Sequence, residues 1–501
     1  MYDKQLKRGV LVNLISLVSW LIHPLFFVIV TWLFGPELLG VYFLASFITE
    51  VANSTVTSGY NDAAMIFGSH HADKEDAHDE LYGVFANALL MSLGLSGLVL
   101  IAAHFGVVPM VEWLYDDRAD LAGGLMILVW TLPFMAITGS CIAATKARMH
   151  MEYAAAINGF ASPLLLLSTS LIAWWVEGGL IGLMIAHLVT RAVLAAMAVW
   201  GFTRVFESRK MFRAMRHFRL HRKMLTFALS QSLNMTFNRY ATRLDVIMLA
   251  AFGHSNVEVA FYASAALLTF NIRQIKFIFS NSLAPIVARY HKAGDSALFE
   301  ETLGRVARWT TTLVVPAALA AIVLRADILT LVHPSYTDDS VFMVVLLATP
   351  FLSCAFGLAG NCIVYTAHTN WNLLNAVLIA GLNTGFNLLL IPPLGLLGAA
   401  VATALASLLY SVLQLIELWF LERVTIRLGA VFKAHLGWVL LVPLLVALWD
   451  PGVNGTVVTR IATAVGLVLA YGAALLLVRH PEAHALLRRL VRIVSPSQAS
   501  E

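Results

Sequence analysis

The sequence predicts an all-α, polytopic membrane protein with about fourteen transmembrane helices. Hydrophobic residues make up 59% of the 501 residues and charged residues only 12%, whereas a soluble domain carries roughly 25% charged residues. Apolar runs long enough to cross a bilayer core recur from residue 9 to residue 477, and the mean hydropathy is +0.79. Lysine and arginine gather in alternate connecting segments, as expected for a chain that crosses a membrane repeatedly.

The expected spans follow one another with short connections. The first apolar run is too long for the core of a signal peptide, and no small-residue cleavage pattern follows it, so we expect it to remain as the first span. The second span is the least hydrophobic. The approximate cores are 9–34, 37–68, 80–105, 120–145, 152–176, 179–203, 224–252, 257–285, 305–325, 339–366, 370–391, 396–420, 432–449 and 458–478.

The placement of basic residues predicts that both termini lie in the cytoplasm. With the spans alternating, 25 of the 33 Lys and Arg fall in cytoplasmic segments. Only Arg118, Arg325 and Arg460 fall on the opposite side. This asymmetry agrees with the positive-inside rule, and because one missed span would reverse it downstream, it also supports the span count. We therefore expect a bacterial inner-membrane protein with cytoplasmic ends.

A large basic loop divides the chain. We expect an N-terminal lobe over 1–203 with spans one to six, a cytoplasmic loop over 204–223, and a C-terminal lobe over 224–420 with spans seven to twelve. The final pair of spans occupies 421–480, and a cytoplasmic tail occupies 481–501. Two six-helix lobes suggest an internal repeat with a site between them. The basic loop is interpreted as an anchor on anionic lipid, and 481–494 as a basic amphipathic helix on the inner surface.

The sequence favours a transporter over an enzyme. The expected outer loops are too short for a catalytic domain, and no G-x-x-x-x-G-K-[ST] loop for nucleotide phosphates occurs. Cys141, Cys354 and Cys362 all lie in apolar runs, so neither disulfides nor a metal site is indicated. We expect no cofactor, no metal and no nucleic-acid partner. The expected partners are membrane lipids, the transported molecule and a coupling ion, H⁺ or Na⁺.

Span seven carries a polar stripe inside an apolar run. At 100° per residue, its polar side chains fall on one face, and two arginines four residues apart lie beside them. A charge facing lipid at mid-membrane costs at least about 2.5 kcal/mol, so this face must meet a water-filled cavity or a polar contact with another helix. The stripe consists of Gln231, Asn234, Asn238, Thr242 and Asp245, flanked by Arg239 and Arg243.

Span eight adds Arg273 and Lys276, three residues apart on one face. With Arg239 and Arg243 they make four expected mid-membrane cations, and only Asp245 is nearby in sequence to neutralise them. The excess positive charge predicts an anionic partner, and the planar guanidinium suits a phosphate or pyrophosphate. The alternative for Asp245 is a structural ion pair with Arg239 or Arg243 that joins helices.

The first lobe has polar faces of its own. In span two, Glu50, Asn53, Thr57 and Asn61 recur at spacings of three and four, with Asp62 beside them. Span six carries His187, Thr190 and Arg191 on one face. These faces predict either the opposite wall of a substrate cavity or ordinary polar packing between helices. The candidate substrate-binding residues are Arg239, Arg243, Arg273, Lys276, Asn238, Asn234 and Arg191, and the candidate ion-coupling residues are Asp245, Glu50 and Asp62.

Two segments carry a resemblance to a known family. LFGPELLGVYFLASF (33–47) joins spans one and two, and GLNTGFNLLLIPPLGLLGAAVATALASLLY (381–410) contains Asn383, Asn387 and an IPPLG turn. Together with RLDVIMLAAFG in span seven, these resemble the polysaccharide exporter, or O-antigen-type flippase, branch of the multidrug/oligosaccharidyl-lipid/polysaccharide (MOP) superfamily. The resemblance implies two six-helix lobes in a V shape, alternating access, and export of an oligosaccharide linked to undecaprenyl pyrophosphate.

Three other functions remain open from the sequence. Peptidoglycan-precursor (lipid II) flippases of similar fold place arginines in their first two spans, whereas 9–34 and 37–68 contain none. Drug or cation antiporters of the superfamily prefer cationic substrates, which a cationic cavity disfavours. A membrane polysaccharide polymerase or ligase needs catalytic groups on outer loops, and nothing marks the outer acids as catalytic. An O-antigen, capsule or exopolysaccharide exporter, acting with a polysaccharide assembly machinery, is therefore the leading hypothesis.

Overall fold

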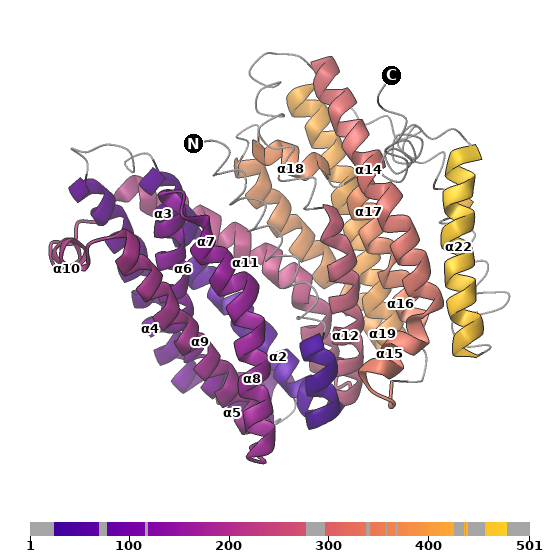
Figure 1. Ribbon diagram of the computed structural model, residues 1–501, viewed down its shortest axis with the longest axis horizontal. Helices are drawn as coiled ribbons and strands as arrows, with labels where there is room; N and C mark the ends of the chain where they lie inside the picture. Colours follow the sequence, from indigo (N-terminus) through magenta and orange to yellow (C-terminus); the bar gives the residue numbers. More distant parts are fainter. Residues whose placement is uncertain are drawn as a thin grey trace, which may run out of the picture. The chain divides into compact units, whose positions relative to one another are not determined.

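The computed structural model describes residues 25–69, 78–115, 119–276, 296–336, 341–356, 358–365, 369–424, 435, 437–438 and 456–477. Within these ranges every regular element is a helix, which confirms the all-α fold class (Figure 1). Two compact units divide the chain: Met1–Ala263 with Ala376–Thr384, and Ser264–Asn375 with Gly385–Glu501. The lobe boundaries expected from the basic loop stay a prediction, as does the V shape.

The first unit is built from closely packed helices. In chain order they are α2 (Pro36–Asn53), the π-helix η1 (Ser54–Ser58), α3 (Gly59–Ser69), α4 (His78–Tyr115), α5 (Ala119–Leu128), α6 (Thr131–Ala147), α7 (Met151–Ala154), the π-helix η3 (Ala155–Ala161), α8 (Ser162–Trp175), α9 (Gly179–Val205), α10 (Ser208–Arg216) and α11 (Arg222–Ala251). Among them, α6 contacts α9, and α3 contacts both α6 and α11. The helix α12 (Asn256–Arg273) begins in this unit and ends in the second.

The second unit contains α14 (Ser296–Val323), α15 (Arg325–Val332), α16 (Val341–Leu346), α17 (Ala348–Ala355), α18 (Leu358–Tyr365), most of α19 (Thr369–Glu422) and α22 (Val457–Leu477). Small side chains let its helices approach: Ala307, Ala355, Ala359 and Cys362 are fully or almost fully buried in one apolar cluster. Such small residues are the usual interface of membrane helices, because lipid gives helices no hydrophobic reason to associate.

Eight helices in the described part are long and apolar enough to cross a membrane. They are Pro36–Ser69, Glu80–Val107, Ala119–Ala147, Met151–Trp175, Gly179–Val205, Ser296–Val323, Trp371–Glu422 and Val457–Leu477. Their ends lie close to those of the predicted spans, so the polytopic class is confirmed. The count of fourteen stays a prediction. Residues 9–24, 277–285, most of 432–449 and the tail lie outside the described residues.

Two predicted spans appear as one long helix, and one predicted span is divided. Within α19, Gly395 has a φ of 55° and a ψ of −129°, so the chain turns at the IPPLG segment where the sequence predicted a connection. The span predicted at 339–366 instead contains the three short helices α16, α17 and α18. Pro350 lies in the first turn of α17, where its missing N–H is tolerated. Because α17 begins just before it, the proline does not interrupt the hydrogen bonds of a longer helix.

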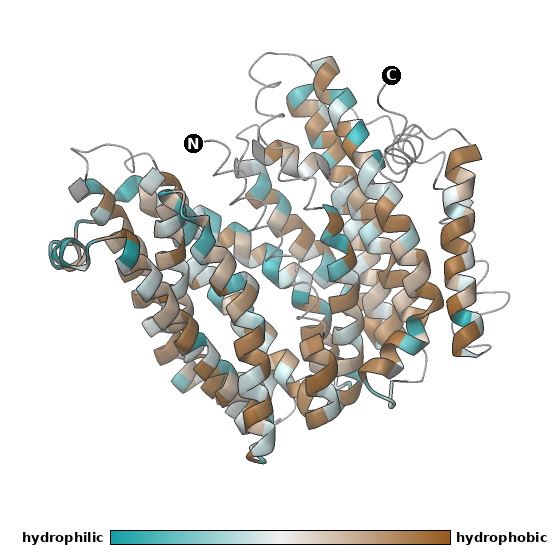
Figure 2. Cartoon of the chain, viewed as in Figure 1, coloured by the Kyte–Doolittle hydropathy of each residue, from teal (hydrophilic) through white to brown (hydrophobic). Residues whose placement is uncertain are grey.

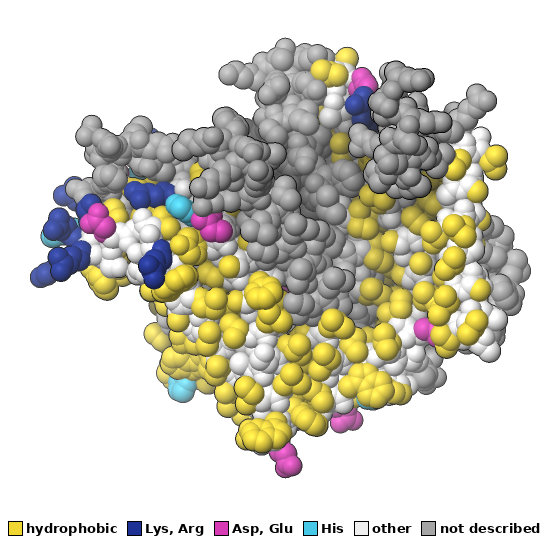
Figure 3. All heavy atoms as spheres, viewed as in Figure 1, with side chains coloured by type: hydrophobic (Ala, Val, Ile, Leu, Met, Phe, Trp, Pro, Cys, Tyr) yellow, Lys and Arg dark blue, Asp and Glu magenta, His cyan; other side chains and the backbone are white. Residues whose placement is uncertain are grey.

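The outer surface of the units is apolar. Figure 2 shows hydrophobic residues along most of the length of the helices, and in Figure 3 hydrophobic side chains cover much of the described surface. Trp113 and Trp175, near the ends of α4 and α8, are 82% and 80% exposed. Exposed tryptophans at helix ends are typical of the membrane–water interface. Lys and Arg side chains instead gather beside α10 (Figure 3), which lies in the predicted cytoplasmic loop.

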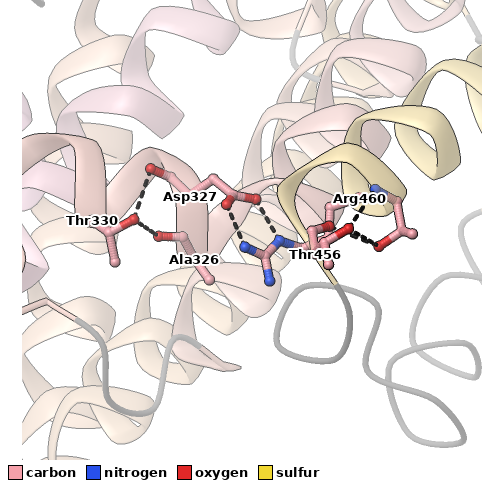
Figure 4. A network of polar contacts seen from close by, with 6 residues as sticks. Ala326, Asp327, Thr330, Thr456 and Arg460 are labelled. Atoms are coloured by element: carbon pink, nitrogen blue, oxygen red, sulfur yellow. Dashed lines mark hydrogen bonds and ion pairs between the residues drawn. The ribbon is translucent and has the colours of Figure 1, made fainter.

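An ion pair holds α22 to the second unit. Arg460 donates two hydrogen bonds to the carboxylate of Asp327 in α15, at 2.7 and 2.5 Å (Figure 4). Both side chains are largely covered, at 14% and 20% exposed. Paired N–H donors on one carboxylate fix orientation as well as distance. Tyr471 on α22 also donates to the carbonyl of Thr312 in α14 at 3.4 Å.

Candidate functional site

Glu50 on α2 receives the two arginines of α11. The Nε of Arg243 donates to Glu50 Oε2 at 3.2 Å, and a terminal nitrogen of Arg243 lies 3.1 Å from the same oxygen. The nearest nitrogen of Arg239 lies 3.9 Å from it. The i, i+4 spacing of the two arginines puts both on one side of α11, so one carboxylate serves two guanidinium groups. The cluster of Glu50, Arg239 and Arg243 therefore carries one excess positive charge.

The two arginines differ in exposure. Arg243 is 14% exposed and lies over the ring of Phe47, with its guanidinium carbon 4.1 Å from the ring centroid. Arg239 is 47% exposed. Phe47 stands three residues before Glu50 on α2, so one helix face supplies both the ring and the carboxylate. Arg243 is thus held by the protein, and Arg239 is the arginine more open to an incoming anion.

Asp245 has a different environment. Its side chain is 5% exposed and accepts a hydrogen bond from the hydroxyl of Tyr262 in α12 at 2.9 Å. Both arginines of α11 pair with Glu50. Tyr262 gives Asp245 a polar partner on α12, and the choice between a structural and an ion-coupling role for Asp245 stays a prediction. Sequence reasoning missed Tyr262, because nothing in its apolar surroundings marks it as a partner.

The polar stripe of α11 forms a chain of hydrogen bonds. Gln231 donates to Asp62 of α3 at 2.9 Å, and Asn234 donates to Gln231 at 3.5 Å. Asn238 in turn donates to the side chain of Asn234 at 2.9 Å. Asn234 is buried, at 3% exposed. The sequence predicted that this face meets either a water-filled cavity or a polar contact with another helix. At the Gln231 end, the face makes a polar contact with Asp62 of α3.

A polar cavity of about 290 Å³ lies within the first unit, beside this hydrogen-bond chain. The predicted site residues Asp62 and Arg191 line it, together with Lys146 of α6. We call it the Asp62 cavity. Its lining comes from Asn53, Thr57, Ser58, Asn61, Asp62, Met65, Met135, Thr138, Gly139, Ile142, Ala143, Lys146, Asn158, Arg191 and Leu194. The sequence marks Lys146 only as a charge on the predicted cytoplasmic side, because its place beside the cavity depends on how α6 packs.

His187 ties Arg191 to Tyr42. The Nε of Arg191 donates to His187 Nε2 at 3.1 Å, and His187 Nδ1 lies 2.8 Å from the hydroxyl of Tyr42. Because a guanidinium can only donate, Nε2 must accept, and the ring proton belongs on Nδ1. The imidazole is therefore neutral and donates to Tyr42. The His187 ring thereby links the Nε of Arg191 to Tyr42 of α2.

Arg273 and Lys276 belong to the second unit. The guanidinium carbon of Arg273 lies 5.4 Å from the centroid of the Phe270 ring. Lys276 is buried, at 9% exposed. Arg239 and Arg243 lie in the first unit. The grouping of all four cations around one substrate therefore stays a prediction.

A family model supplies the observation that decides the class. The model described as polysaccharide biosynthesis protein matches residues 29–342, well over half of the chain. The chain belongs to the polysaccharide biosynthesis protein family. This family is part of the MOP superfamily, so the resemblance noted in the sequence is confirmed. No curated protein sequence matches the chain.

Solved structures show that this polysaccharide biosynthesis protein has the MOP fold. The lipid II flippase MurJ in an inward closed conformation aligns with a TM-score of 0.67 at 12% identity, covering 93% of this chain and 98% of MurJ. An inward-facing multidrug resistance MATE family transporter aligns with a TM-score of 0.65 at 14% identity, covering 84% and 99%. A MOP superfamily transporter from Pyrococcus furiosus aligns with a TM-score of 0.54 at 15% identity, covering 84% and 96%. The chain is a multi-pass membrane transporter of this superfamily.

Proposed function

We propose that this transporter is a flippase that moves an oligosaccharide linked to undecaprenyl pyrophosphate across the bacterial inner membrane by alternating access. The observation that carries the proposal is the Glu50–Arg239–Arg243 cluster, in which one carboxylate serves two guanidinium groups. A pyrophosphate offers oxygens in the geometry that arginine forks favour. Membership of a polysaccharide biosynthesis family supports a glycan as the rest of the substrate.

Glu50 suits the role of a resident counter-ion. Without it, two guanidinium groups would stand in a membrane helix unneutralised, which costs several kcal/mol. An incoming pyrophosphate can form an ion pair with Arg239 first, because Arg239 is the more exposed arginine and lies farther from Glu50. Arg243 keeps its contacts with Glu50 and Phe47 and positions the cluster. The expected cargo is an O-antigen, capsule or exopolysaccharide unit.

Coupling to an ion gradient or to the membrane potential would drive the cycle. Asp245 is the better coupling candidate, since Glu50 is already paired with two cations. A buried carboxylate inside a membrane protein is expensive unless it binds a proton or a cation, or has partners. Both termini are proposed to lie in the cytoplasm, and assembly enzymes for the glycan are the proposed partners.

Transport of a polyprenyl-pyrophosphate oligosaccharide in proteoliposomes tests the proposal. The wild type should move the carrier between leaflets, and an Arg239→Glu, Arg273→Glu double variant should lose most of that activity while remaining in the membrane. Arg209→Glu in α10 serves as the control, because one reversal in a loop with eight cations leaves the basic loop largely intact. Full transport by the double variant would overturn the cavity assignment. Movement of lipid II alone, or of drugs alone, would overturn the glycan-exporter assignment.

A further inference from the structure

The Asp62 cavity adjoins the Glu50–Arg239–Arg243 cluster through Arg191, which lines a second, smaller pocket together with Glu50, but its other lining residues are its own. Its volume of about 290 Å³ is at the lower end of the roughly 300–1,000 Å³ typical of small-molecule sites. This volume is enough for one ring of a sugar.

Two π-helices border this cavity. The segment η1 contributes Thr57 and Ser58, and η3 contributes Asn158. A π-turn places an extra residue in the helix, with poorer backbone geometry than an α-turn, and such turns occur frequently at functional sites. Two helices of the first unit thus depart from α-geometry at the same cavity.

The charges around the cavity favour an anion. Asp62 already accepts a hydrogen bond from Gln231, and the Nε of Arg191 is directed to His187. Among the described residues, neither the terminal nitrogens of Arg191 nor the ammonium of Lys146 has a hydrogen-bond partner, and Glu50, which lines a neighbouring pocket with Arg191, is the other carboxylate near that guanidinium. Two cations face one carboxylate, so the lining carries one excess positive charge. An anionic group in the cavity would satisfy that excess.

The neutral lining favours hydroxyl groups around that anion. Asn53, Asn61 and Asn158 each offer an amide that donates, and Thr138 adds a hydroxyl. The amide oxygens of Asn53 and Asn61 also accept from Thr57 and Ser140, and each can accept once more. A phosphodiester has no donors for the amide oxygens. A neutral sugar leaves both cations without a counter-charge. A sugar ring that carries a carboxylate matches the amides and the cations together.

We propose that the Asp62 cavity binds one acidic sugar, of the hexuronate type, and that it selects for glycans containing such a residue. This inference rests on the proposed function for its biological meaning, because the sugar would be part of the translocated oligosaccharide. The carboxylate pairs with Lys146 and Arg191. The ring hydroxyls exchange hydrogen bonds with the asparagine amides, and Gln231 holds Asp62 at the edge of the site.

Binding of monosaccharides to the full-length protein in detergent micelles tests this subsite without any transport step. The probes are D-glucuronate and D-glucose, and saturation-transfer NMR measures their affinities. We expect glucuronate to bind more tightly than glucose. Lys146→Met should weaken glucuronate by about tenfold or more, the loss expected for a charged hydrogen-bond partner. Lys210→Met, on exposed α10 and away from the cavity, is the matched control and should change nothing.

A second variant, Asn61→Asp, keeps the test valid if Lys146→Met fails to fold. Asn61→Asp keeps the shape of the side chain and the oxygen that accepts from Ser140, and it adds a negative charge to the lining. It should reduce glucuronate binding more than glucose binding. Equal affinity for the two sugars, or undiminished glucuronate binding in both cavity variants, would overturn the subsite.

The two proposals can fail separately. If glucuronate binding is selective and depends on Lys146 but the protein moves no lipid-linked glycan, the subsite is supported and the flippase function is contradicted. If the protein moves glycans equally well with carboxylated and carboxyl-reduced carriers, the flippase function is supported and the subsite is contradicted. In the transporting protein, the ratio of acidic to neutral carrier moved should fall toward one in Lys146→Met and stay at the wild-type value in Lys210→Met.

Discussion

Glu50 is the residue on which the charge balance of α2 and α11 depends. Replacing it with Gln leaves Arg243, 14% exposed, without a counter-ion. Removing one partner of a fully buried ion pair costs about 3–5 kcal/mol. The Glu50 side chain is 33% exposed, so solvent screening reduces the expected loss to about 1–2 kcal/mol for Glu50→Gln. Thermal unfolding in detergent micelles measures it.

Glu301 provides the matched control for that substitution. It pairs with Arg305 one turn away on α14, and both side chains are more than half exposed. Surface pairs of this kind contribute about 0.3–0.5 kcal/mol. Glu301→Gln should therefore leave the unfolding temperature almost unchanged. Equal losses in the two variants would mean that Glu50 is not a special counter-ion.

Asp245 separates a structural role from a coupling role. Asp245→Asn retains an oxygen that can accept from Tyr262, so the fold should survive, but the side chain can no longer bind a proton or carry charge. If Asp245 couples transport, the variant should transport at the same rate with and without an imposed H⁺ or Na⁺ gradient. Transport rates in proteoliposomes measure this. A gradient response equal to that of the wild type would leave Asp245 only a structural role.

The polar stripe of α11 could be predicted from sequence, but its partners could not. A helical wheel shows which residues of one helix share a face, and Arg239, Arg243 and Asp245 all lie on α11. It contains no information on which helix lies opposite. The sequence therefore offered Asp245 as the partner of the arginines, whereas the packing of α2 against α11 brings Glu50 to them.

At the scale of helices, Gly59 permits the close approach of α3 and α11. Its backbone N–H donates to the hydroxyl of Ser232 at 3.1 Å, and a Cβ at this position would collide with the backbone carbonyl of Ala228. Backbone yields less easily than a flexible side chain. Gly59→Ala should therefore force the helices apart and destabilise the protein by about 1–3 kcal/mol, the usual range for overpacking.

Gly83 on α4 is the control for this prediction. A Cβ there meets nothing within 4 Å. Alanine is about 0.5–1 kcal/mol more favourable than glycine inside a helix, so Gly83→Ala should be neutral or stabilising. Unfolding in detergent compares the two variants side by side. Similar unfolding temperatures for both would contradict a tight contact at Gly59.

Hydropathy predicts helices well where composition is uniform and poorly where it is not. The spans predicted at 80–105 and 179–203 agree closely with Glu80–Val107 and Gly179–Val205, because each is one unbroken apolar run. The span at 339–366 is just as apolar, yet Pro350 divides it. The π-helices η1 and η3 had no signal in the sequence, since an extra residue in a turn leaves the apolar pattern almost unchanged.

For the whole molecule, internal contacts bear on the predicted charge asymmetry between the two sides of the membrane. Three arginines fall on the predicted outer side, and the structure accounts for two of them. Arg460 is paired with Asp327. Arg325 is fully buried and donates to the carbonyl of Ile322 at 2.9 Å. Basic residues influence topology mainly as charges in short loops beside the spans. Arginines that are engaged in internal contacts therefore argue only weakly against a cytoplasmic location of both termini.

We therefore expect both termini in the cytoplasm, with the connection at 116–118 on the outer side. Green fluorescent protein fused after residue 501 should fluoresce, because it folds in the cytoplasm, and alkaline phosphatase fused there should be inactive. Alkaline phosphatase fused after residue 117 should be active. Activity at both positions would require an odd number of spans, whereas activity at residue 501 without activity at residue 117 would reverse the whole topology and the side on which Lys146 lies. Because Lys146 lies at the C-terminal end of α6, on the predicted cytoplasmic side, the same reporters decide whether that cavity can receive a sugar made inside the cell.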